Sequence, residues 1–175
     1  MIRKINWFFI VAGTLIMMVI MMRTGESLKT PTTPMGILNL EFAYTGETAS
    51  AVMSAWQTAS PSGGDNIQSA IKNTWLDFVF LFFYSLFLFY ACKTIAETFS
   101  GTLESLGKFL AMGALNAGLL DIAENTGMLL MLHGYTTNSL AMLTTLFAMA
   151  KWALALTALV YIIVTLPFYL YKKIK

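Results

Sequence analysis

Four blocks of apolar residues set the strongest limit on what this chain can fold into. A helix needs about 20 residues to cross the hydrocarbon core of a bilayer. The blocks lie at about 5–22, 74–94, 107–132 and 140–166. Only 11% of the 175 residues are charged, far fewer than in an average soluble domain. We therefore expect an all-α membrane protein, a bundle of four transmembrane helices in a single integral membrane domain (1–175).

The segment 24–64 is the most polar part of the chain, and we expect it to lie outside the membrane. Within it, Thr33-Pro34 is typical of a helix start. An amphipathic helix over 34–57, on the membrane surface or over the bundle, is therefore predicted. Alternating apolar and polar residues over 38–45 would instead fit a strand, although a lone strand would have no partner. The apolar face of the helix would consist of Leu38, Phe42, Ala49, Val52, Met53 and Trp56.

The basic residues predict the orientation of the spans. One side of the predicted bundle would carry Arg3, Lys4, Lys93, Lys108, Lys172, Lys173 and Lys175, and the other Arg23, Lys29 and Lys72. Cytoplasmic loops carry an excess of Lys and Arg, so both termini should face the cytoplasm. The predicted location is the inner membrane of a bacterial cell, as a multi-pass protein with membrane lipids as its partners.

Several polar residues lie inside the apolar blocks, where a bilayer tolerates charge poorly. In the third block, Asp121, Glu124 and Asn125 fall on one stripe of a helix. At a rise of about 1.5 Å per residue, Lys151 lies about 20 Å along its helix from Asn138, and Asp121 lies about 18 Å from the other end of the same short link. Antiparallel neighbours would bring the two to similar depth. An Asp121–Lys151 ion pair is therefore predicted.

Two further acidic residues extend this prediction. Asp77 lies in the second block with Tyr84 seven residues later on the same face, and Glu41 flanks the apolar face of the amphipathic helix. A charge at the bilayer centre costs roughly 3 kcal/mol on insertion scales, and such groups are functional by default. The alternative is that the ion pairs only fix helix register. We expect a polar pocket in the outer half of the bilayer, open toward the outside and lined by Glu41, Asp77, Tyr84, Asp121, Glu124, Asn125 and Lys151.

The residue inventory limits the chemistry of this pocket. Asp121 and Glu124 could hold a hard cation or act as acid and base, so a bound cation is possible and no other cofactor is predicted. The chain has one histidine and one cysteine, which excludes two-histidine metal sites and internal disulfides. A net charge of +2 without a basic run argues against nucleic-acid binding.

Three functions are compatible with such a pocket. The first is binding of a small polar ligand, a lipid headgroup or a cation, with Lys151 neutralising the carboxylates. The second is a membrane-embedded enzyme that acts on a lipid-phase substrate, with Asp121 or Glu124 as general acid or base. The third is a proton or ion pathway, which in so narrow a bundle would require a homo-oligomer.

Several sequence blocks resemble those of a family of small bacterial four-helix membrane proteins. They are Thr33-Pro34 through Glu41, Trp56, Leu76-Asp77-Phe78 with Tyr84, Asp121-x-x-Glu124-Asn125, and Lys151. The resemblance spans most of the chain. It implies a fold of four spans and implies no activity.

Overall fold

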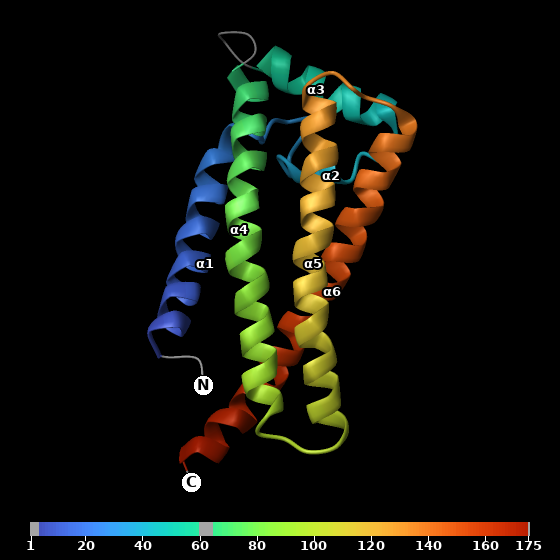
Figure 1. The fold of residues 1–175 in the computed structure, drawn as a ribbon. Helices are drawn as coiled ribbons and strands as arrows, with labels where there is room; N and C mark the ends of the chain where they lie inside the picture. The colour runs from blue at the N-terminus through green and yellow to red at the C-terminus, as the bar shows by residue number, and fades with distance from the viewer. Residues whose placement is uncertain (1–3, 60–64, 175) are drawn as a thin grey trace.

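Four long helices form the body of the molecule. The computed structural model describes residues 4–59 and 65–174, and within these ranges every regular element is helical. The long helices are α1 (Lys4–Thr24), α4 (Asp65–Ala96), α5 (Thr102–Leu132) and α6 (Asn138–Ile174) (Figure 1). Each contains one of the four predicted apolar blocks, and each is long and apolar enough to cross a membrane. The prediction of an all-helical fold with four candidate spans is confirmed.

The helices form an antiparallel bundle with α1 at its edge. The helix α5 packs against both α4 and α6, whereas α1 packs against α4 (Figure 1). Short links join α4 to α5 and α5 to α6, with Gly101 and Gly134 at φ values of 69° and 93°. Only glycine adopts such values without strain. The start of α1 and the end of α6 lie toward one end of the bundle, and the short helices lie at the other (Figure 1).

The segment between α1 and α4 contains three short helices instead of one continuous helix. These are η1 (Glu26–Leu28), α2 (Leu38–Glu41) and α3 (Gly46–Ala59). The prediction of a helix is confirmed over 46–57, where α3 forms, and was wrong for its start at 34 and for a continuous helix through 42–45. The alternative of a strand over 38–45 was also wrong, because 38–41 is helical.

Side chains of α6 explain the break between α2 and α3. Tyr44 has a φ of 59°, which is uncommon for a residue other than glycine. Its backbone N–H donates a hydrogen bond to Thr145 Oγ1 at 3.0 Å, and the Gly46 N–H donates to Asn138 Oδ1 at 2.9 Å. These bonds satisfy backbone donors that a continuous helix would have used internally. The break therefore depends on tertiary contacts.

The break also changes which residues share the apolar face. Three residues on the inner face of α3 are buried, as predicted: Ala49, Val52 and Trp56. Phe42 is 39% exposed and does not belong to that face, since it lies beyond the end of α2. The Trp56 indole N–H donates to the Leu28 carbonyl at 2.9 Å and fixes α3 to the segment after α1.

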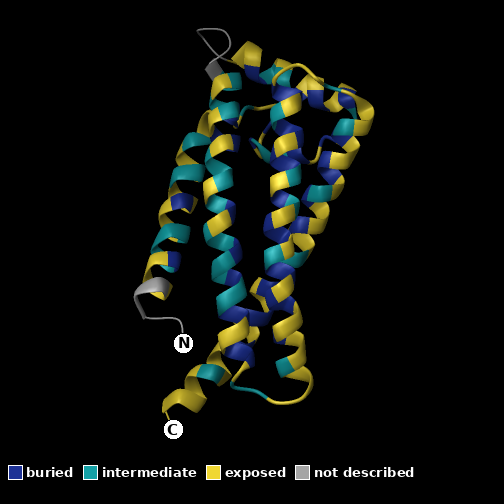
Figure 2. Cartoon of the chain, in the orientation of Figure 1, coloured by how far each residue is buried: buried dark blue, intermediate teal, exposed yellow. Residues whose placement is uncertain are grey.

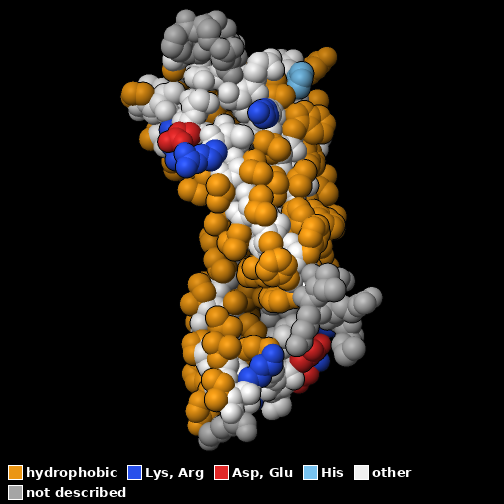
Figure 3. Space-filling view, turned by 90° about the vertical axis from the view of Figure 1, so that its left-hand side faces the viewer, with side chains coloured by type: hydrophobic (Ala, Val, Ile, Leu, Met, Phe, Trp, Pro, Cys, Tyr) orange, Lys and Arg blue, Asp and Glu red, His pale blue; other side chains and the backbone are white. Residues whose placement is uncertain are grey.

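Buried positions follow the inner faces of the helices, and exposed ones face outward (Figure 2). On the face formed by α1 and α4, hydrophobic side chains cover the middle and charged side chains lie toward the two ends (Figure 3). Two apolar cores fill the interior. The upper core, near α3, includes Leu28, Leu40, Trp56, Met128 and Met131. The lower core includes Leu88, Cys92, Ile95, Leu110, Tyr161 and Ile162.

Candidate functional site

Lys151 lies among three carboxyl groups between the two apolar cores. Its Nζ is 3.1 Å from Asp121 Oδ1, 2.7 Å from Glu124 Oε2 and 3.6 Å from Glu41 Oε2. The predicted Asp121–Lys151 ion pair is therefore present. Lys151 is only 5% exposed and Glu124 is completely buried. Charges this deeply buried are stable only when they are paired and hydrogen-bonded.

The network extends from Asp121 to α4. The Tyr84 hydroxyl donates to Asp121 Oδ2 at 2.7 Å. The Asn125 amide donates to Asp77 Oδ2 at 2.9 Å and to Asp121 Oδ1 at 3.3 Å. The structure thus brings all seven predicted pocket residues into one network, which we call the Lys151 cluster. It consists of Glu41, Asp77, Tyr84, Asp121, Glu124, Asn125 and Lys151. Ligand binding by these residues stays a prediction.

Small residues on α5 allow the cluster to form. A Cβ added at Gly118 would lie 3.0 Å from Ser85 Oγ on α4, and one added at Gly127 would collide with Thr144 Oγ1 on α6. The helix α5 therefore lies close to both neighbours. Its polar stripe reaches both at once, with Asn125 directed toward α4 and Glu124 toward α6.

Glu41 reaches the cluster because α2 packs against α5 and α6. The Glu41 carbonyl accepts a hydrogen bond from Thr145 Oγ1 at 2.8 Å, and its Oε2 accepts one from Trp152 Nε1 at 3.2 Å. These α6 residues lie about 10–20 Å along the helix from Asn138 at a rise of about 1.5 Å per residue. The α2 segment thus packs against α5 and α6, and the expected position of 34–57 on the membrane surface or over the bundle stays a prediction.

Sequence reasoning missed two polar partners of Glu41. Thr145 shares a face of α6 with Ala148 and lies near the face of Lys151, and this stripe of small and hydroxyl residues was a usable signal. Trp152 gave no signal, because an indole in an apolar block is ordinarily a lipid-facing or interfacial side chain. Its ring is also 5.5 Å from Lys151 Nζ, at cation–π distance.

The Lys151 cluster is closed in this structure. Glu41, Asp121 and Lys151 are at most 5% exposed, whereas Asp77 and Tyr84 are half-buried. The side chains contact each other directly through hydrogen bonds and ion pairs. These side chains form a buried network and not the expected pocket that opens toward the outside. The upper and lower apolar cores lie on either side along the bundle.

The charges of the cluster do not balance. The cluster contains four carboxyl groups and one lysine, so full ionisation would leave three excess negative charges. Two like charges 4 Å apart repel by about 4 kcal/mol at an effective dielectric constant of 20. The buried oxygens Glu124 Oε1 and Asn125 Oδ1 have no hydrogen-bond partner among the described residues, and Glu124 Oε2 is close to Lys151 without hydrogen-bonding alignment. The cluster therefore lacks both positive charge and donors.

A metal site is not evident from the geometry. In the two ranges that the structure describes, no three His, Cys, Asp or Glu side chains are grouped to hold an ion. The sequence-based suggestion of Asp121 and Glu124 as metal ligands stays a prediction.

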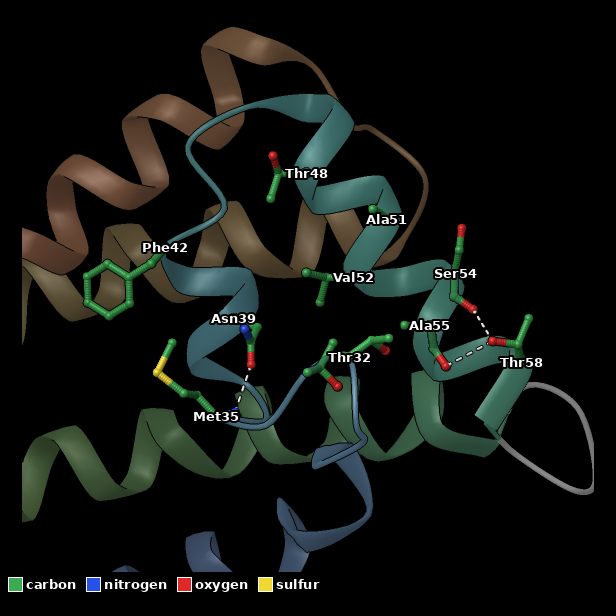
Figure 4. A pocket seen from close by; sticks show the side chains of 11 residues that line it. Thr32, Met35, Asn39, Phe42, Thr48, Ala51, Val52, Ser54, Ala55 and Thr58 are labelled. Carbon is green, nitrogen blue, oxygen red and sulfur yellow. Dashed lines mark hydrogen bonds between the residues drawn. The ribbon is translucent and has the colours of Figure 1, made fainter.

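A separate groove lies between α2 and α3 (Figure 4). It has a volume of about 580 Å³ and is lined by apolar, hydroxyl and amide side chains without a charge. Asn39 and Phe42 of the α2 segment line the groove, whereas Glu41 belongs to the Lys151 cluster. The segment therefore separates two different environments.

No protein-family model, curated protein or solved structure matches this chain. The function must therefore be argued from the chemistry of the Lys151 cluster. The resemblance to small bacterial four-helix membrane proteins stays a prediction.

Proposed function

We propose that the chain is a multi-pass protein of the bacterial inner membrane with both termini in the cytoplasm. The four long apolar helices support insertion. Lys93, Lys108, Lys172 and Lys173 lie in the helix ends near the α4–α5 link, whereas Arg23, Lys29 and Lys72 lie toward the α3 end. This bias favours a cytoplasmic location for the end with the α4–α5 link.

We further propose that the Lys151 cluster binds a small cation. The observation that carries this proposal is the excess of carboxyl groups over lysine, together with the buried and unpartnered Glu124 Oε1. A cation would supply the missing positive charge. A lipid headgroup fits less well, because its phosphate would face carboxylates and the cluster is closed to bulky groups.

The other two functions receive less support from the geometry. Asp121 accepts hydrogen bonds from Lys151, Tyr84 and Asn125, which oppose its action as a general base. Glu124, the other predicted acid or base, is completely buried and out of reach of a lipid-phase substrate in this structure. An ion pathway would need to cross the upper and lower apolar cores. Occlusion between two cores instead favours a binding site.

Thermal unfolding of the purified protein in detergent tests the cation proposal. Sodium, potassium, magnesium and calcium chlorides would be compared at constant ionic strength, along with a series of pH values. A cation at a 100-fold excess over its Kd stabilises the folded state by about 2.7 kcal/mol. We expect Tm to rise with one of these salts or with proton concentration, and Glu124→Gln to abolish that rise.

Glu97→Gln is the matched control, because Glu97 is exposed beyond the end of α4 and lies outside the cluster. This variant should respond to cations and pH as the wild type does. A wild-type Tm that is independent of every salt and of pH would overturn the cation proposal.

A further inference from the structure

The hydrogen-bond donors of the Lys151 cluster are divided unequally among its carboxyl groups. Asp121 accepts from three donors, at 2.7, 3.1 and 3.3 Å. Glu41 accepts from the Trp152 indole and Asp77 from the Asn125 amide. Glu124 is the most buried of the four carboxyl groups and accepts no hydrogen bond from the described residues.

The number of donors around each carboxyl group indicates which groups are ionised and which is neutral. Buried carboxylates require donors for their oxygens. Asp121 has such donors, and Lys151 is within ion-pair distance of it. Glu124 faces the Lys151 ammonium at Oε2 only, and its buried Oε1 has no donor among the described residues. A proton bound at Oε1 would remove the negative charge and turn this unpaired acceptor into an O–H donor. We propose that Glu124 carries a proton in the resting protein and that this proton is the bound cation, an inference that rests on the proposed function.

The position of Lys151 favours a proton over a metal ion. Metal cations such as Mg²⁺ and Ca²⁺ require six or more oxygen ligands at about 2.0–2.6 Å. The Lys151 ammonium lies 2.7 Å from Glu124 Oε2 and 3.1 Å from Asp121 Oδ1, so it occupies the place between the carboxyl groups that a metal would need. A proton needs no coordination shell. Glu124 Oε2 can still face the ammonium while Oε1 carries the proton.

The groups that face Glu124 come from every element packed around it. Lys151 lies on α6, Glu41 on α2 and Asp121 on α5 itself, while α4 contributes the more distant Asp77 and Tyr84. All three other carboxyl groups oppose a negative charge on Glu124, and one lysine favours it. Protonation of Glu124 reduces the excess negative charge of the cluster from three to two. The remaining excess lies on half-buried Asp77 and on Glu41, which the Trp152 indole and Lys151 contact.

Infrared spectroscopy of the protein in lipid nanodiscs tests this inference. A protonated carboxyl group gives a C=O stretching band that shifts in D₂O, whereas a carboxylate gives none in that region. We expect such a band at neutral pH in the wild type and in Glu97→Gln. Glu124→Gln should lack it. If that variant does not fold, a pH titration of the wild type should remove the band under alkaline conditions.

Glu41→Gln and Asp77→Asn locate the proton. Both should keep the band, because its proton is on Glu124. Loss of the band in either variant while Glu124→Gln retains it would overturn the assignment to Glu124. A wild type without any carboxyl band would overturn the inference as a whole.

The infrared result separates failure of this inference from failure of the proposed function. If the band is absent but a metal salt raises Tm, the proton inference fails and cation binding stands. If the band is absent and neither salt nor pH affects Tm, both fail.

Discussion

At the scale of single residues, Lys151 is the only positive charge among the described residues that contacts the buried carboxyl groups. Removing one partner of a buried ion pair is strongly destabilising, since the other charge stays buried without compensation. We expect Lys151→Met to lower the free energy of unfolding by about 3–5 kcal/mol. Chemical unfolding in detergent measures this loss.

Lys72→Met is the control for this prediction, because Lys72 is exposed on α4. It should unfold like the wild type. Adding Asp121→Asn to Lys151→Met should recover part of the stability, because the second change removes a charge that the first leaves unpaired. Wild-type stability of Lys151→Met would contradict the cluster.

The sequence predicted some residues of the cluster and missed others for physical reasons. Asp121 and Lys151 could be paired because helical rise and a short link determine their depths. Trp152 could not be assigned, because its indole N–H reaches Glu41 only where α2 lies beside α6. A helical pattern specifies which face a side chain occupies, not which distant segment packs there.

At the scale of helices, the close contact of α5 with α6 depends on Gly127. We expect Gly127→Ala to destabilise the protein by about 1–3 kcal/mol, because the added methyl group collides with Thr144 Oγ1 and forces the two helices apart. Thermal unfolding measures the effect. The variant should keep the carboxyl band but shift its frequency, since Lys151, the one group that favours ionisation of Glu124, moves away from it.

Gly113→Ala provides a matched control on the same helix. Its added Cβ would lie 3.5 Å from Leu154 Cδ2, an ordinary van der Waals distance. This variant should therefore be as stable as the wild type. Equal stability of the alanine variants at 113 and 127 would show that close packing at Gly127 is unimportant.

The helices themselves were largely predictable, whereas the path of the 24–64 segment was not. Apolar block length alone located α1, α4, α5 and α6, because a span must match the bilayer. The break at Tyr44 arises from bonds to Thr145 and Asn138, which are about a hundred residues away in sequence. Local periodicity contains no information about such partners.

At the scale of the whole molecule, the proposed orientation places α3 outside the cell and the α4–α5 link inside. Ser54 and Ser100 are exposed at these two ends. Cysteines at these positions, in a chain carrying Cys92→Ala, would be treated with a membrane-impermeant maleimide. We expect Ser54→Cys to react in intact spheroplasts and Ser100→Cys to react only after permeabilisation. The reverse pattern would contradict the proposed orientation.

The charge imbalance also predicts how stability depends on pH. At neutral pH the folded protein would hold a proton on Glu124 that a solvent-exposed glutamate, with a pKa of about 4.3, has released. Because the folded state then binds more protons, its stability falls as pH rises. The slope is about 1.4 kcal/mol per pH unit for one proton. This decrease in stability extends from about pH 4.3 to the pH at which Glu124 of the folded protein releases its proton.

The free energy of unfolding of the wild type and Glu124→Gln, measured against pH, tests the central claim most directly. Glutamine cannot ionise and has nearly the shape of a protonated glutamate. We predict that the free energy of unfolding of the wild type falls with rising pH. The slope for the glutamine variant should be shallower by about 1.4 kcal/mol per pH unit, which is the contribution of one proton. An equal slope in both proteins would show that Glu124 does not bind the proton that the proposal assigns to the Lys151 cluster.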